Sequence, residues 1–90
     1  MKPTNAADLK RINAMFSTIQ GLLQNLWARW QDEGKYENID DYGKVIAKNL
    51  PKGFKLSRMT KRPFGFEFSI NGGLYAIKAT GQYLSWKRVS

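Results

Sequence analysis

The chain has 90 residues, a length that suits one domain and is too short for two. Hydrophobic residues make up 42% of it, which argues against intrinsic disorder, and the absence of cysteine excludes disulfide bonds and thiolate metal sites. The formal net charge is +8, and residues 51–90 hold eight basic residues and one acidic residue, against seven and six in residues 1–50. This basic half predicts attraction to a polyanion, which can be nucleic acid, an anionic membrane or an acidic protein surface.

The N-terminal region predicts a long amphipathic helix. Asn5 can cap its first turn, with Asp8 three residues later, and Gly34 is typical of a helix end. Apolar residues recur at alternating steps of three and four, the spacing of one helix face: Leu9, Ile12, Phe16, Ile19, Leu23, Leu26 and Trp30. Met15, Leu22 and Trp27 widen this line into a stripe, so we expect it to face a core, with a homodimer through this helix as the alternative.

A second, shorter helix is predicted after Asn38, which can act as its cap. Ile39, Tyr42 and Ile46 form one apolar line along it. Pro51 then prevents the helix from continuing.

From Phe54 onward the apolar period is two, which is typical of strands. Asn71-Gly72-Gly73 predicts a hairpin, because a tight primed turn needs positive φ angles. A turn at Asn71-Gly72 pairs Phe68 with Tyr75, and a turn at Gly72-Gly73 pairs Phe68 with Ile77, so the face is determined but the register stays open. With a further turn at Gly81-Gln82, the predicted inner face holds Phe64, Phe66, Phe68, Ile70, Tyr75, Ile77, Leu84 and Trp86.

Phe54 and Leu56 predict an opening strand, and residues 59–63 are expected to follow it as a basic loop. The predicted fold class is α+β. Two N-terminal helices, at about 5–50, pack on one face of a three- to four-stranded antiparallel β-meander at about 54–89. We expect residues 1–90 to form a single domain.

The open face of this sheet, together with the 59–63 loop, collects the basic residues. Such a surface can contact successive phosphates without reading the base sequence. The candidates are Lys55, Lys61, Arg62, Lys78 and Lys87, with Arg58 and Arg88 at strand ends. Tyr83 is the one aromatic residue expected on this face, and it is a candidate for stacking on a base. The simpler alternative is a solvated face that only confers solubility.

Trp27 and Trp30 lie three residues apart and therefore share a face of the first helix. Packing against the sheet is the expected role of such large apolar side chains. The alternative is an exposed anchor for a partner protein or a dimer mate.

The sequence offers little for catalysis. There is no histidine, no Cys/His metal set, no P-loop and no dinucleotide glycine motif, so we expect no enzyme activity, metal or cofactor. In architecture alone, two helices beside an antiparallel sheet are similar to ribonuclease toxins of the RelE/ParE kind, which can use Lys, Arg and Tyr for chemistry. No motif matches, and those toxins usually begin with a strand that this sequence lacks.

The leading prediction is a non-enzymatic binding protein that contacts DNA or RNA phosphates. The alternative is a small phage- or plasmid-type regulator or inhibitor that docks on an acidic protein surface, and a RelE/ParE-like ribonuclease is third. A membrane-surface role is disfavoured, because the basic half reads as sheet and not as an amphipathic helix. The N-terminus lacks a signal-peptide pattern and no run approaches the roughly 18 apolar residues of a membrane span, so we expect a cytoplasmic protein.

Overall fold

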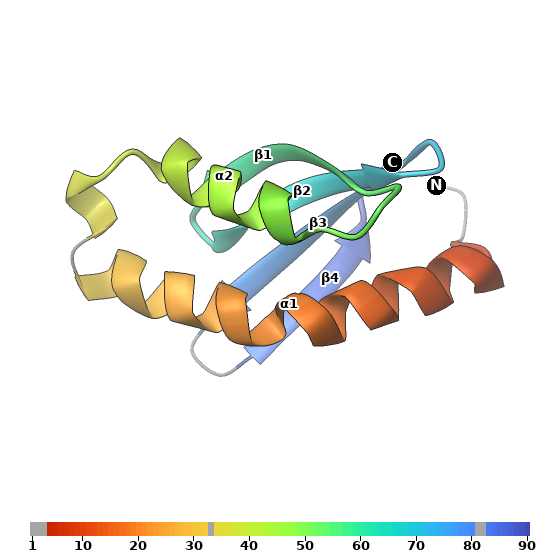
Figure 1. Ribbon diagram of the computed structural model, residues 1–90, viewed down its shortest axis with the longest axis horizontal. Helices are drawn as coiled ribbons and strands as arrows, with labels where there is room; N and C mark the ends of the chain where they lie inside the picture. The colour runs from red at the N-terminus through yellow and green to blue at the C-terminus, as the bar shows by residue number, and fades with distance from the viewer. Residues whose placement is uncertain (1–3, 33, 81–82) are drawn as a thin grey trace.

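The computed structural model describes residues 4–32, 34–80 and 83–90. The elements are α1 (Ala6–Asp32), the short 3₁₀ helix η1 (Gly34–Tyr36), α2 (Ile39–Asn49), β1 (Lys55–Lys61), β2 (Phe64–Ile70), β3 (Gly73–Thr80) and β4 (Tyr83–Arg88). The strands form one antiparallel sheet in the order β1-β2-β3-β4. The α+β fold that the sequence predicts is thus confirmed, with four strands (Figure 1).

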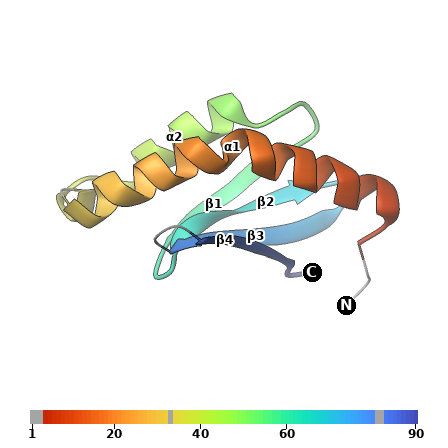
Figure 2. The ribbon, with the colours of Figure 1, turned by 90° about the horizontal axis from the view of Figure 1, so that it is seen from below.

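Both helices cover the same face of the sheet (Figure 2). α2 packs against β1, and α1 crosses β2 and β3. One core cluster of aromatic and aliphatic side chains lies between the helices and the sheet, and it includes the fully buried residues Phe66, Phe68 and Tyr75. Neither helix has the combination of length and apolar character needed to cross a bilayer, within the part of the chain that the structure describes.

α1 begins at a cap that also joins it to the sheet. Asn5 Oδ1 accepts a 2.8 Å hydrogen bond from the Asp8 backbone N–H, and Asn5 Nδ2 donates to Asp8 Oδ2 at 3.1 Å. Asp8 is buried, and its Oδ1 accepts a 2.6 Å hydrogen bond from Asn71 Nδ2 in the β2–β3 turn. The predicted cap is confirmed, and the same carboxylate also fixes the start of the helix to the hairpin.

Replacing Asp8 with alanine should lower the free energy of unfolding by about 2 kcal/mol, because it removes part of the cap and leaves a partly buried donor on Asn71 without its partner. Urea denaturation measures this difference. Asp32→Ala is the control, since Asp32 is an exposed carboxylate at the other end of α1, and its effect should stay within about 0.5 kcal/mol. Equal effects of the two substitutions would contradict the assigned role of Asp8.

The buried line of α1 follows Ile12, Met15, Ile19 and Leu23. Leu9 is 41% exposed, so it lies outside the core, contrary to its place in the predicted apolar line. The reason is that Asp8, and not the next residue Leu9, faces the sheet in the first turn of α1. The Asp8 side chain is hydrogen-bonded to Asn71 in the β2–β3 turn, so Leu9 points away from it.

The β2–β3 turn is the two-residue turn at Asn71-Gly72. Both residues have positive φ angles, of 51° and 80°. Phe68 pairs with Tyr75, which selects one of the two registers that the sequence left open. Asparagine and glycine both tolerate this backbone conformation, which matches the twist of the flanking strands.

The β3–β4 pairing is also the predicted one. Ala79 pairs with Leu84, and Ile77 pairs with Trp86. The predicted turn at Gly81-Gln82 itself lies outside the described residues. The inner sheet face has the predicted composition, with Leu84 and Trp86 on β4 only half-buried at the edge of the core.

β1 differs from the prediction. Leu56 pairs with Phe68 and Arg58 pairs with Glu67, so Ser57 is an extra residue that forms a β-bulge. Beyond the bulge the strand continues to Lys61, and only residues 62 and 63 connect β1 to β2. The predicted loop at 59–63 is therefore wrong. An edge strand with a polar run and a bulge does not show the period of two that identified the other strands.

Candidate nucleic-acid interface

The sheet surface that faces away from the helices, called here the open face, contains a groove. Its volume is about 470 Å³, and residues of all four strands line it. The lining residues include four cations and one carboxylate, namely Arg58, Arg62, Lys78, Lys87 and Glu67. Thr60 and Ser85 add hydroxyl groups to the same groove.

The position of this open-face groove follows from the strand pairing. One row of paired residues across the sheet consists of Arg58, Glu67, Ala76 and Lys87, and the next consists of Thr60, Gly65, Lys78 and Ser85. In each row one central strand contributes a very small residue, Ala76 in β3 or Gly65 in β2. The longer side chains around these two positions therefore stand above the sheet with a hollow between them.

The structure brings most of the predicted basic residues to this face. Arg58, Arg62, Lys78 and Lys87 border the open-face groove and are exposed or half-exposed at its rim. Lys55 is exposed on the same face at the start of β1, where it pairs with Ser69. These five residues come from three strands and one connection, so only the tertiary fold assembles them.

Tyr83 also has the predicted position. It begins β4, pairs with Thr80 and is 80% exposed. An exposed ring at the end of a basic face is available for stacking on a base.

Two predicted residues lie elsewhere. Lys61 pairs with Phe64, whose side chain is buried under the helices, so Lys61 is on the helix side of the sheet. The bulge at Ser57 causes this, because one extra residue reverses the face of every later side chain in the strand. Arg88 pairs with Tyr75, and its guanidinium carbon lies 5.5 Å from the centre of the buried Tyr75 ring. Arg88 therefore packs on the inner face and does not join the open face.

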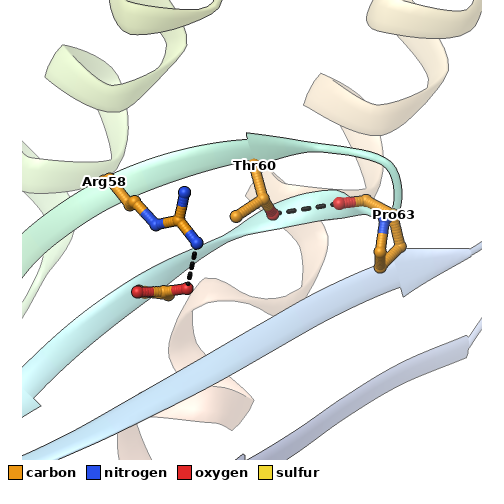
Figure 3. Close-up of polar contacts among 4 residues, drawn as sticks. Arg58, Thr60 and Pro63 are labelled. Atoms are coloured by element: carbon orange, nitrogen blue, oxygen red, sulfur yellow. Dashed lines mark hydrogen bonds and ion pairs between the residues drawn. The ribbon is translucent and has the colours of Figure 1, made fainter. Parts of the chain in front are cut away.

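Among the described residues that line the open-face groove, Glu67 is the one carboxylate, and it pairs with Arg58. Arg58 Nη2 donates to Glu67 Oε2 at 2.8 Å. Figure 3 labels Arg58 and draws this bond as a dashed line to the unlabelled carboxylate. This hydrogen bond holds the pKa of Glu67 below its ordinary value, so Glu67 is ionised at neutral pH. Because Glu67 offsets much of the charge of Arg58, the positive potential of the groove comes mainly from Arg62, Lys78 and Lys87.

The β1–β2 connection is held in place by a local contact. Thr60 Oγ1 donates a 2.9 Å hydrogen bond to the carbonyl oxygen of Pro63 (Figure 3). This bond fixes the connection at one end of the open-face groove, and with it the backbone that carries Arg62.

Trp27 and Trp30 both pack against the core, and both also line a second hollow. The Trp30 ring meets Tyr42 edge-on at 5.5 Å and is stacked near Phe64 at 6.2 Å between centroids. The second hollow, called here the tryptophan cavity, has a volume of about 470 Å³ and lies between the end of α1 and the β1–β2 connection. Lys61 and Arg62 line it as well, a combination that residue spacing in the sequence could not reveal.

Among the described residues, the clear pKa shifts outside the open face occur where α1, η1 and α2 meet. Burial raises the pKa of Tyr42, and the nearby Glu37 carboxylate acts in the same direction. A 3.0 Å hydrogen bond from Arg29 lowers the pKa of Glu37. Among the described residues, Tyr42 Oη is buried and meets no partner at strict hydrogen-bonding geometry, although the Glu37 carboxylate is close enough to raise its pKa.

The open face has the chemistry of an anion-binding surface. It presents flexible ammonium and guanidinium groups around a hollow. Among the described residues, no group of three His, Cys, Asp or Glu side chains could hold a metal ion. Comparisons with protein-family models, with curated proteins and with solved structures found no match to this chain.

Proposed function

We propose that this protein binds nucleic acid through phosphate contacts on its open face. The observation that carries the proposal is the placement of Arg58, Arg62, Lys78 and Lys87 around one groove, with Glu67 as the only carboxylate among its described lining residues. Phosphate contacts from lysine and arginine supply most of the affinity of sequence-independent nucleic-acid binding.

The spacing of the cations supports phosphate contact. Lys78 pairs with Ser85 and Lys87 pairs with Ala76, so the two lysines occupy diagonal positions on neighbouring strands. Diagonal positions in an antiparallel pair lie about 7–8 Å apart. This separation is of the order of the distance between adjacent phosphates in one nucleic-acid strand, so each lysine can serve a different phosphate.

The test is to titrate the protein into labelled DNA or RNA oligonucleotides of about 20 nucleotides. Fluorescence anisotropy measures binding at several salt concentrations between about 50 and 200 mM. Three to four phosphate contacts should give a log–log salt slope of about −2 to −3 on single strands. Absence of binding at the lowest salt, or an affinity that does not depend on salt, would contradict the proposal.

Glu67→Gln should strengthen binding by roughly threefold to fivefold at low salt, because it removes the carboxylate from the groove and releases Arg58 for a phosphate. Asp41→Asn is the matched control, since it also removes one carboxylate that pairs with a cation, Lys44, at 3.5 Å. Asp41 lies on α2, on the opposite side of the sheet, so its effect should stay below about twofold. Equal gains in the two variants would show that net charge, and not the open face, controls binding.

A further inference from the structure

We infer that the tryptophan cavity is a pocket for one unpaired nucleobase and its flanking phosphate, which makes single-stranded nucleic acid the substrate class. This inference rests on the proposed function. It gives a role to Trp27, Trp30 and Lys61, which the open face does not use.

The size and lining of the cavity suit such a ligand. Its volume of about 470 Å³ falls within the roughly 300–1,000 Å³ of small-molecule pockets. Two indole rings supply flat apolar surface, and Gln31 and Thr80 supply groups that can hydrogen-bond the edge of a base. Bases stack on aromatic side chains regardless of sequence, because every base has a π face.

The tryptophans are held in place before a ligand arrives. Trp30 is fixed by its contacts with Tyr42 and Phe64, at 5.5 and 6.2 Å between ring centroids. Trp27 lies one turn earlier on α1 and packs against the same core while lining the cavity. Rigid rings lose little conformational entropy on binding, so stacking on them adds directly to affinity.

The charge at the cavity suits a phosphate. Lys61 and Arg62 both line it and both are exposed, and none of its described lining residues is acidic. The one-residue shift at the Ser57 bulge places Lys61 here, because it turns Lys61 toward the helices and away from the open face.

The cavity adjoins the open-face groove at the β1–β2 connection. Arg62 and Pro63 line both hollows, so the β1–β2 connection forms their common border. We expect a strand whose phosphates contact Lys78 and Lys87 to pass around this connection and to place one of its bases against Trp27. A duplex cannot do so without unstacking a base, and we therefore expect a preference for single strands.

The test compares a single-stranded oligothymidine of about 20 nucleotides with a duplex of the same length, for the wild-type protein and Trp27→Leu. Leucine keeps an apolar, helix-compatible side chain but removes the ring. We expect Trp27→Leu to weaken single-strand binding about tenfold and to leave duplex binding within about twofold. Phe16→Leu is the control, because Phe16 is a half-buried aromatic residue of the same helix that does not line the cavity, and it should change neither affinity.

Lys61→Glu is a second variant. Lys61 is exposed, so this substitution does not disturb the core. It should also weaken single-strand binding more than duplex binding. Both nucleic acids could bind with the expected salt dependence while neither variant lowers the single-strand affinity selectively. That result would contradict a nucleobase pocket at the tryptophan cavity and would still agree with the proposed function. If the wild-type protein binds no oligonucleotide at low salt, both ideas fail.

Discussion

The double variant Lys78→Glu/Lys87→Glu should bind single-stranded nucleic acid at least about 100-fold more weakly than the wild-type protein at low salt. Each substitution removes one phosphate contact. Each also adds a carboxylate to a groove that already contains Glu67, so that three negative charges would surround the bound strand. Both lysines are exposed on the sheet and pair with small residues, Ser85 and Ala76, so the fold should tolerate the changes.

The matched control is Lys10→Glu/Lys48→Glu, which changes the net charge by the same amount. Lys10 and Lys48 are exposed residues of α1 and α2, on the helical side of the molecule. Their reversal should cost less than about tenfold in affinity, since it alters only the long-range field. Fluorescence anisotropy at several salt concentrations measures both variants. Equal losses would mean that the overall charge attracts the ligand and that the open face has no special role.

Gly65→Ala should lower the free energy of unfolding by about 3 kcal/mol, the upper end of the range for overpacking substitutions. A Cβ at Gly65 would overlap the carbonyl oxygen of Ile77 and lie 2.9 Å from the Cα of Lys78. These atoms belong to the backbone of β3, so no side-chain rotation can relieve the overlap. The two central strands would have to separate where the core residues Phe66 and Ile77 are paired.

Gly21→Ala adds the same methyl group at a position where nothing lies within 4 Å. Gly21 is in the middle of α1 and exposed, so alanine should stabilise the protein by about 1 kcal/mol through its higher helix propensity. Urea denaturation of the two variants should therefore give shifts of opposite sign. A Gly65→Ala protein as stable as the wild type would contradict the close approach of β2 and β3.

The residue pattern by itself determined the parts of this protein that depend on local preferences. Residues 64–70 alternate between large apolar and small or polar side chains, and Asn71-Gly72 accepts positive φ angles, so the inner face of β2 and β3 follows from sequence. The helix caps at Asn5 and Asn38 form for the same reason, because each contact spans only two or three residues. The basic nature of the open face was also predictable, since Lys78 and Lys87 lie on strands with regular alternation.

The tertiary structure alone decided where the remaining cations and aromatic rings meet. The bulge at Ser57 forms only when β1 pairs with β2, and it sends Arg58 to the open face and Lys61 to the helix side. The tryptophan cavity likewise requires α1 and the β1–β2 connection to lie together, although Trp27 and Arg62 are 35 positions apart in the sequence. Local propensities act over a few residues, whereas a bulge and a cavity depend on which surfaces pack against each other. The sequence pattern therefore predicted which residues could bind a ligand, but it could not predict the position of all of them.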